Sequence, residues 1–126
     1  FRVLCIDNEP KILEGMALLL SGWGCDVLQA GSSGAIEEML STWTVAPDMI
    51  IADYHLDDTD GVDVIVSLRR FYQRDIPALL ITADRTLEVR AQAEKEGITV
   101  QHKPVRPAAL RAYINQVYSV VRAAAE

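Results

Sequence analysis

Residues that could do chemistry follow the apolar segments of this chain. In the stretch IIADYHLDDTDG (residues 50–61), an apolar run ends in Asp53. A solvated loop accounts for Asp57 and Asp58, whereas a carboxylate at the end of a half-buried strand costs desolvation energy and needs a reason. Other apolar segments also end in polar or small residues, namely Asp7, Asn8 and Glu9; Thr82, Ala83 and Asp84; and His102, Lys103 and Pro104.

Together these groups would suit phosphoryl transfer. Asp7, Glu9 and Asp53 would repel one another at neighbouring strand ends unless a cation joined them. Carboxylate oxygens are hard ligands that suit Mg²⁺, which commonly takes one or two of them. Lys103 adds a compact positive charge and Thr82 adds a hydroxyl, and such a set can stabilise a transferring phosphoryl group. Asp53 would be the nucleophile, because aspartate can form an acyl phosphate.

An alternation of short β-rich segments with amphipathic helices would position these residues. The helices are indicated by apolar residues at helical spacing, with Pro10 in a first turn and Gly97 at an end. The predicted strands cover residues 2–7, 25–30, 48–53, 78–82 and 98–102. The predicted helices cover residues 10–24, 34–43, 62–72, 86–97 and 107–124.

Strict alternation predicts an α/β fold with a doubly wound, five-stranded parallel sheet. Parallel strands joined by right-handed crossovers place helices on both faces of the sheet. The mostly apolar strands agree with this, since both sheet faces would be covered. In such sheets ligands bind beyond the carboxyl ends of the strands, which is where the candidate residues would gather.

Composition indicates one compact domain. The chain has 126 residues, of which 50% are hydrophobic and 24% charged. A formal net charge of −6 with scattered Lys and Arg argues against nucleic acid as a direct partner. No apolar run is long enough to span a bilayer, so no direct membrane contact is expected. Cys5 and Cys25 lie in apolar segments and are typical of reduced core residues in a cytoplasmic protein.

Five features occur in register along essentially the whole chain. They are Asp7, Asp53, Asp60–Gly61, Thr82 and Lys103–Pro104. In this arrangement the chain resembles the receiver domain of two-component response regulators. The resemblance implies a flavodoxin-like strand order of 2-1-3-4-5. The stretches CIDNEP and ITAD…HKPV are most similar to receivers of hybrid histidine kinases. Because the chain begins with Phe rather than Met, we expect residues 1–126 to be a single domain within a longer protein.

The resemblance implies a role for each matching residue. Asp53 would be the phosphoacceptor, supplied by a histidine kinase or a histidine phosphotransfer domain. The Mg²⁺ cofactor would be held by Asp53, Asp7, Asn8 and the backbone carbonyl of His55. Thr82 would hydrogen-bond the phosphoryl group and swing inward on activation.

Lysine and proline complete the implied site. Lys103 would pair with Asp53 and then with a phosphoryl oxygen. Pro104 would follow a cis peptide bond that places the lysine. Side chains at His55 and Asp84, two residues after Asp53 and Thr82, would flank the incoming water and tune the lifetime of the phosphoryl group. Equally, His55 could be a solvent-facing residue that uses only its carbonyl.

Two positions depart from the family pattern. Asn8 stands where a second acidic residue is usual, so we expect weaker metal binding unless Glu9 compensates. Val100 stands where Tyr or Phe is usual, and a small residue that is stiff at χ1 cannot make the large aromatic rotation. His102 could contribute to signalling instead. The candidate modulators of the site are therefore Glu9, Ala83, Asp84, Val100 and Pro104.

The same residues bear on three alternative functions. A flavin or nucleotide site is disfavoured, because Asn8, Glu9 and Pro10 stand where a Gly-rich loop would follow the first strand. An aspartyl phosphatase would usually carry a second aspartate at His55. The serious rival is a pseudo-receiver, which uses the same fold as a docking module that is poorly or not phosphorylated. The sequence leaves open whether the domain forms a homodimer.

Overall fold

The structure, a computed structural model, describes residues 1–42 and 44–125. Strands and helices alternate along this part of the chain as predicted, with boundaries that differ by a few residues. The elements are β1 (Arg2–Ile6), α1 (Pro10–Gly22), β2 (Asp26–Ala30), α2 (Ser33–Leu40), β3 (Met49–Asp53), α3 (Gly61–Tyr72), β4 (Ala78–Thr82), α4 (Leu87–Lys95), β5 (Thr99–His102) and α5 (Pro107–Ala125). The helix predicted over residues 34–43 ends at Leu40 in the structure. The last residue of that prediction, Trp43, lies outside the described residues.

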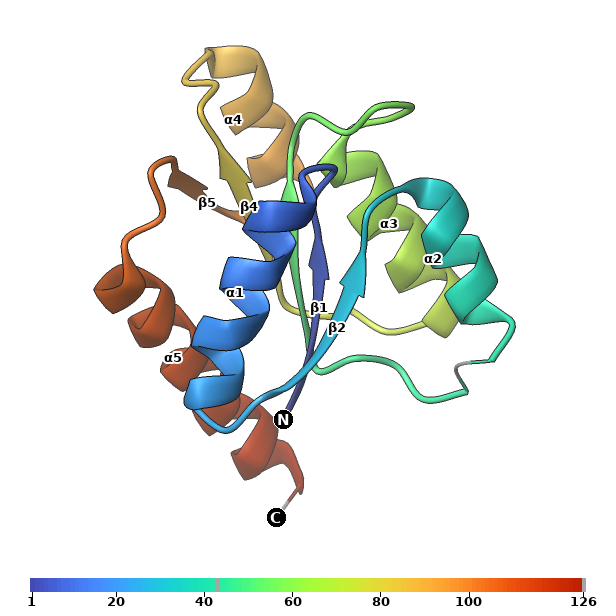
Figure 1. The fold of residues 1–126 in the computed structure, drawn as a ribbon, viewed down its shortest axis with the longest axis vertical. Coiled ribbons are helices and arrows are strands. Elements are labelled where there is room, and N and C mark those ends of the chain that lie inside the picture. Colours follow the sequence, from blue (N-terminus) through green and yellow to red (C-terminus); the bar gives the residue numbers. More distant parts are fainter. Residues whose placement is uncertain (43, 126) are drawn as a thin grey trace.

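The five strands form one parallel sheet. Their order is β2-β1-β3-β4-β5, so β1 and β3 lie side by side and the chain winds outward from them in both directions (Figure 1). This confirms the predicted flavodoxin-like topology. All strands point the same way, so their carboxyl ends share one edge of the sheet.

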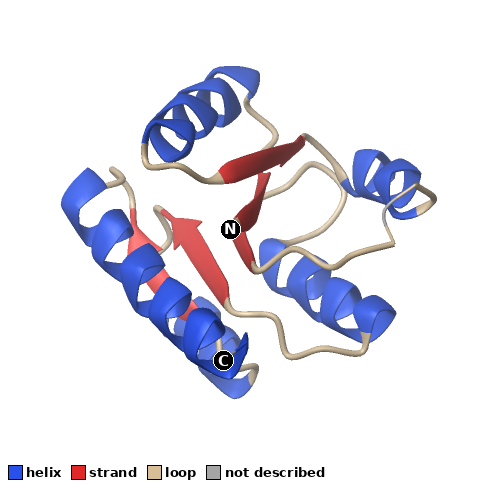
Figure 2. Ribbon diagram, turned by 90° about the horizontal axis from the view of Figure 1, so that it is seen from below, coloured by secondary structure: helices blue, strands red, loops and turns tan. Residues whose placement is uncertain are grey.

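Each face of the sheet carries its own apolar core. Residues of β1, β3 and β4 alternate between the two faces. On one face Leu13 and Leu20 of α1 and Leu110 and Ile114 of α5 pack against the sheet. On the other face α2, α3 and α4 supply the apolar side chains. Helices therefore lie on both sides of the strands, as Figure 2 shows, and the strands can be apolar throughout.

Side-chain caps fix where three helices begin. Ser32, Asp60 and Thr86 precede α2, α3 and α4 and accept hydrogen bonds from the backbone N–H groups of Ala35, Asp63 and Val89, at 3.1, 2.9 and 3.4 Å. A cap satisfies an N–H group that has no partner inside its helix. The caps therefore anchor the loops that follow β2, β3 and β4. They also explain one acid of the stretch after Asp53, since Asp60 caps α3.

The two cysteines and the helix lengths also bear on predictions from the sequence. Cys5 is buried, Cys25 is half-buried, and both are free thiols, as predicted. Burial raises the pKa of Cys5 to about 12, so this thiol stays protonated in the core. Among the described residues, none of the helices combines the length and apolarity needed to cross a bilayer.

Gly61 allows α3 to pack directly against the end of β3. Its N–H group donates to the carbonyl of Tyr54 at 2.8 Å. A Cβ atom at this position would overlap the backbone carbonyl oxygen of Asp53 and would lie 2.8 Å from Leu80 Cδ1. The backbone at Asp53 and the first residue of α3 are therefore in contact, and only glycine fits between them.

We expect Gly61→Ala to lower the free energy of unfolding by about 2 kcal/mol or more, because the methyl group must displace β3 or α3. Urea denaturation followed by circular dichroism measures this. The matched control is Gly15→Ala in α1, where a Cβ meets nothing within 4 Å. That change should stabilise the protein by up to about 1 kcal/mol, as expected for alanine in an exposed helix. A Gly61→Ala protein as stable as the wild type would contradict the packing described here.

Candidate functional site

Three polar residues are buried at the carboxyl edge of the sheet. Asp7 follows β1, Asp53 ends β3 and Thr82 ends β4, with 6%, 8% and 0% of their surface exposed. Among the described residues, these are the polar or charged residues in the buried class. Since a buried polar group is costly unless it has partners, their concentration at one edge marks a candidate site.

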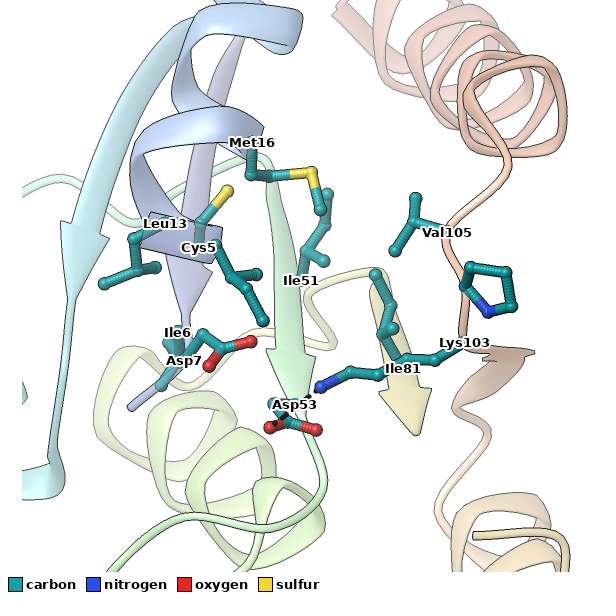
Figure 3. Close-up of a pocket in the computed structure, with 12 residues that line it drawn as sticks. Cys5, Ile6, Asp7, Leu13, Met16, Ile51, Asp53, Ile81, Lys103 and Val105 are labelled. Atoms are coloured by element: carbon teal, nitrogen blue, oxygen red, sulfur yellow. Dashed lines mark ion pairs between the residues drawn. The ribbon is translucent and has the colours of Figure 1, made fainter. Parts of the chain in front are cut away.

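Strand alternation brings two carboxylates and one lysine onto the same face. Asp7 and Asp53 continue the alternation of Cys5 and Ile51, which face α1 and α5. Lys103 reaches toward them from the end of β5 (Figure 3). The three side chains lie at one end of a mostly apolar cavity of about 250 Å³, between α1 and the β5–α5 connection.

An ion pair joins Lys103 to Asp53. Lys103 Nζ lies 3.4 Å from Asp53 Oδ2. The backbone of Lys103 is fixed by its N–H group, which donates to the Thr82 carbonyl at 2.9 Å, and the Lys103–Pro104 peptide is cis as the resemblance implies. Because Asp53 is buried, this pair differs from a surface salt bridge, and loss of the lysine would leave an uncompensated buried charge.

Asp7 carries negative charge that its surroundings only partly compensate. Burial raises the pKa of Asp7 above its usual value, and the negative charge of Asp53 raises it further. The N–H group of Glu9 donates to Asp7 Oδ1 at 2.9 Å and acts in the opposite direction. Asp7 and Asp53 together with one lysine leave a net negative charge, which favours an added cation.

The donor set fits Mg²⁺ held partly by water. Asp7 and Asp53 offer two hard carboxylates, whose mutual repulsion a divalent cation would relieve. In residues 1–42 and 44–125, no three or more His, Cys, Asp or Glu side chains gather as a metal-binding group. A closed structural metal site is therefore not built here, whereas Mg²⁺ commonly takes one or two carboxylates and keeps several waters.

The other predicted metal ligands point elsewhere or contribute through their backbone. Asn8 Nδ2 donates to Asp57 Oδ1 in the β3–α3 loop, at 2.9 Å. The side chain of Glu9 is exposed, and Glu9 reaches the site through its N–H group. His55 exposes 68% of its side chain to solvent. The structure thus brings Asp7 and Asp53 together and leaves the other predicted ligands at the rim.

Thr82 and Asp84 form a short turn beside Asp53. Thr82 Oγ1 accepts a hydrogen bond from the Asp84 N–H group at 2.9 Å. Asp84 Oδ1 accepts from the Thr86 N–H group at 2.8 Å. Hydrogen bonds from Thr86 and then the neighbouring His55 hold the pKa of Asp84 below its usual range. Asp84 is therefore ionised and well placed to hold a cationic partner.

His55 and Asp84, which were both expected to flank the incoming water, contact each other. His55 Nε2 lies 3.6 Å from Asp84 Oδ2, so the β3–α3 and β4–α4 loops meet beside Asp53. The sequence placed each residue near the site but carried no signal that they pair. Among the other modulators, Ala83 is exposed, and Val100 pairs with Leu80 in the sheet and packs on the core face covered by α2, α3 and α4.

Hydrogen bonds that the sequence did not predict tie down the loop after Asp53. Asp57 and Asp58 are exposed, as expected for loop residues, but each accepts a hydrogen bond, from Asn8 Nδ2 and from Ser33 Oγ respectively. On the far side, the Tyr54 hydroxyl donates to Gln92 Oε1 of α4 at 3.0 Å. These partners lie 25 to 49 residues away in sequence, which is why no local pattern signalled them.

Comparison with known proteins gives a consistent answer. The sequence model of a family described as the response regulator receiver domain matches residues 3–115. The chain is 36% identical over 86 residues to the transcriptional regulatory protein TrcR of Mycobacterium tuberculosis, covering 65% of this chain and 31% of that protein. It is 26% identical over 114 residues to the DNA-binding response regulator MtrA of Mycolicibacterium smegmatis, covering 90% of this chain and 48% of MtrA.

Solved structures show the same fold. A response regulator receiver domain protein from Clostridium thermocellum superposes with a TM-score of 0.85 at 25% identity, and the match covers 96% of each chain. The receiver domain of DrrB activated with BeF3 superposes with a TM-score of 0.79 at 18% identity, covering 94% of this chain and 97% of that one. The chain spans about a third of the length of TrcR and about half of the length of MtrA.

The burial of Asp7 predicts a specific pH dependence. Between its usual pKa of 3.8 and the higher pKa in the fold, the folded protein holds a proton that the unfolded chain releases. The contribution of Asp7 to stability therefore falls as pH rises through this window. We expect Asp7→Asn to raise the free energy of unfolding at pH 7 without Mg²⁺, and the gain should shrink as pH is lowered toward 4.

Chemical denaturation in EDTA at several pH values tests this expectation. Glu38→Gln, on an exposed position of α2, is the control and should change stability by less than about 0.5 kcal/mol. A destabilised Asp7→Asn protein at pH 7 would show that hydrogen bonding, rather than uncompensated charge, dominates at this position.

Proposed function

This chain belongs to the response regulator receiver domain family, and we propose that it accepts a phosphoryl group from a phosphohistidine onto Asp53. The observation that supports this most directly is the buried Asp53 carboxylate, held 3.4 Å from Lys103 Nζ at the carboxyl edge of the sheet. A buried carboxylate with one cationic partner keeps its second oxygen for nucleophilic attack.

The proposed reaction exchanges one bond to phosphorus for another. An Asp53 carboxylate oxygen forms a bond to phosphorus while the bond between phosphorus and the donor imidazole nitrogen breaks. The imidazole keeps the electron pair and takes a proton from water. The product is an acyl phosphate on Asp53, and catalysis consists mainly of positioning and of neutralising charge on the phosphoryl oxygens.

Lys103 and Thr82 are suited to binding the transferred group. Lys103 already pairs with Asp53, so its ammonium is close to the place where the phosphoryl oxygens of the product would lie. Thr82 Oγ1 accepts from the Asp84 N–H group, which leaves the hydroxyl hydrogen free to be donated to a phosphoryl oxygen. We expect that donation to require the inward movement of Thr82.

Mg²⁺ is the cofactor we propose for this site. Asp7 and Asp53 would be its carboxylate ligands, with the Asn8 amide oxygen and the His55 backbone carbonyl as neutral ligands. Asn8 uses its Nδ2 atom to bond Asp57, so its Oδ1 atom stays available as a ligand. When bound, Mg²⁺ would supply positive charge that stabilises the phosphoryl oxygens.

The proposal also names a phosphodonor and a parent protein. A histidine kinase or a histidine phosphotransfer domain would supply the phosphoryl group, and a cytoplasmic location goes with that role. We propose that residues 1–126 are a single receiver domain within a longer protein. The stretches CIDNEP and ITAD…HKPV favour a hybrid histidine kinase as that protein.

The competing function is a docking module that is not phosphorylated. Its supporting observation is Asn8, a neutral residue whose amide group is engaged by Asp57 rather than directed at the two carboxylates. Such a module would keep the fold and the Asp53–Lys103 pair without using them for chemistry. The two functions differ in their response to Mg²⁺ and a phosphoryl analogue.

We expect beryllofluoride with millimolar Mg²⁺ to shift the backbone amide resonances near Thr82 and Lys103. The shift should disappear in Asp53→Asn and persist in Asp57→Asn, which alters a neighbouring exposed acid of the same loop. Two-dimensional ¹H–¹⁵N spectra record both outcomes. An unresponsive wild-type protein would support the docking module, and an unchanged response in Asp53→Asn would move the acceptor elsewhere.

Asn8→Asp should strengthen Mg²⁺ binding about tenfold, which corresponds to about 1.4 kcal/mol, because it adds a charged ligand beside Asp7. The new carboxylate would also face Asp57, so the double variant Asn8→Asp/Asp57→Asn removes that repulsion. Asp57→Asn alone is the control that changes the Asn8 partner without adding charge at position 8. Mg²⁺ titration by calorimetry measures all three, and equal affinities would show that position 8 does not face the metal.

A further inference from the structure

A second charged hollow lies on the outer side of Lys103. It is a groove of about 280 Å³ between the β4–α4 and β5–α5 connections. It lies over β5, which is the edge strand of the sheet. We call it the basic groove, and its lining residues are Arg85, Gln101, His102, Lys103, Pro104, Arg106 and Ala109. Three of the 12 Lys and Arg residues of the chain line it, and among the described residues no Asp or Glu does. The fold thus gathers cations that looked scattered in the sequence.

Among the described residues, no Asp or Glu pairs with either arginine of the basic groove. Within the described ranges, neither Arg85 nor Arg106 has an oxygen of Asp or Glu within 4.0 Å of its guanidinium. The nearest acid in sequence to Arg85 is Asp84, which accepts from the Thr86 N–H group and lies 3.6 Å from His55. Gln101 is a neutral residue of the groove, and its Nε2 group donates to the Ala109 carbonyl at 3.2 Å.

Arg69 and Arg74, by comparison, lie in surroundings that include acidic residues. Arg69 donates to the carbonyls of Ile76 and Glu96 and pairs with Asp75 at 3.6 Å. A further groove contains Arg74 but is also lined by Asp75 and Glu96. Cations that share a hollow without acids repel one another, and an anion would relieve that repulsion.

Backbone donors add to the positive character of the basic groove. The first helical hydrogen bond of α5 runs from the Leu110 N–H group to the Arg106 carbonyl. The N–H groups of Ala108 and Ala109 therefore have no partner within the helix, and no acid occurs in its first turn. Ala109 itself lines the groove, beside the guanidinium-bearing residues.

The chemistry of the lining selects phosphate. Two guanidinium forks match the oxygens of a phosphate group bidentately, better than they match a halide. The volume of about 280 Å³ is roughly nine times the ~30 Å³ that one water occupies, so a group as large as a diphosphate fits. Within the described part of the chain, no aromatic side chain other than His102 lines the groove to stack on a nucleobase.

We infer that the basic groove binds the phosphate or diphosphate group of a small organic phosphate, at a site distinct from Asp53. Lys103 lines this groove but directs its Nζ atom to Asp53, so Arg85, Arg106 and His102 would contact the anion. The inference does not depend on phosphorylation of Asp53. It gives this acidic chain one local surface that attracts anions.

Titration with inorganic pyrophosphate and inorganic phosphate tests the inference, at constant ionic strength and in EDTA. We expect saturable shifts of the amide resonances of residues 84–86 and 101–109, in the wild type and in Asp53→Asn. Arg85→Gln and Arg106→Gln should each weaken pyrophosphate binding about tenfold or more, the equivalent of 1.4 kcal/mol. Arg74→Gln, an exposed arginine in a groove that also holds acids, is the matched control and should bind within about twofold of the wild type.

Several results would overturn the inference. They are shifts that do not saturate, equal weakening by Arg74→Gln, and shifts centred on Asp53 that vanish in Asp53→Asn. A glutamate-rich peptide that binds as tightly as pyrophosphate would instead identify a surface for acidic proteins. Because Arg85 and Arg106 are exposed, both variants should fold, and circular dichroism checks this. Their beryllofluoride response should match the wild type, which separates failure of this inference from failure of the proposed acceptor function.

Discussion

The ion pair between Asp53 and Lys103 is the interaction on which the functional edge of this protein depends. Asp53 is buried at the end of the central strand β3, and the charge of Lys103 Nζ, 3.4 Å away, partly offsets it. Asp7 lies close enough for the charge of Asp53 to raise its pKa. One ammonium cannot neutralise two buried carboxylates. The resulting demand for positive charge is what makes a divalent cation and a phosphoryl group plausible occupants of the same place.

The fold holds this charged set by surrounding it with rigid, apolar structure. β3 is apolar on both faces, and Gly61 lets α3 pack against the backbone of Asp53. The loop that follows is tied to β1–α1 by Asn8 and Asp57, and to the start of α2 by Ser33 and Asp58. The charged groups therefore lie in a frame of packed strands, helices and hydrogen-bonded loops.

Negatively and positively charged side chains lie on opposite sides of Lys103. On its inner side lie Asp7 and Asp53, and on its outer side lie the arginines of the basic groove. The chain carries a formal net charge of −6, so a local positive surface arises from the placement of a few residues and not from composition. Lys103 borders both regions, which places any anion in the basic groove next to the lysine that pairs with Asp53.

The sequence by itself determined the fold class and the edge where the site lies. Alternating apolar segments and helical periodicity are local signals, and the rule that parallel strands share one carboxyl edge turned them into the grouping of Asp7, Asp53, Thr82 and Lys103. Only the tertiary structure decided which atoms meet: that Asn8 bonds Asp57, that His55 pairs with Asp84, and that Arg85 and Arg106 line one groove. These contacts join loops far apart in the chain. Their geometry depends on side-chain rotamers and on the packing of whole helices, which no local pattern of residues encodes.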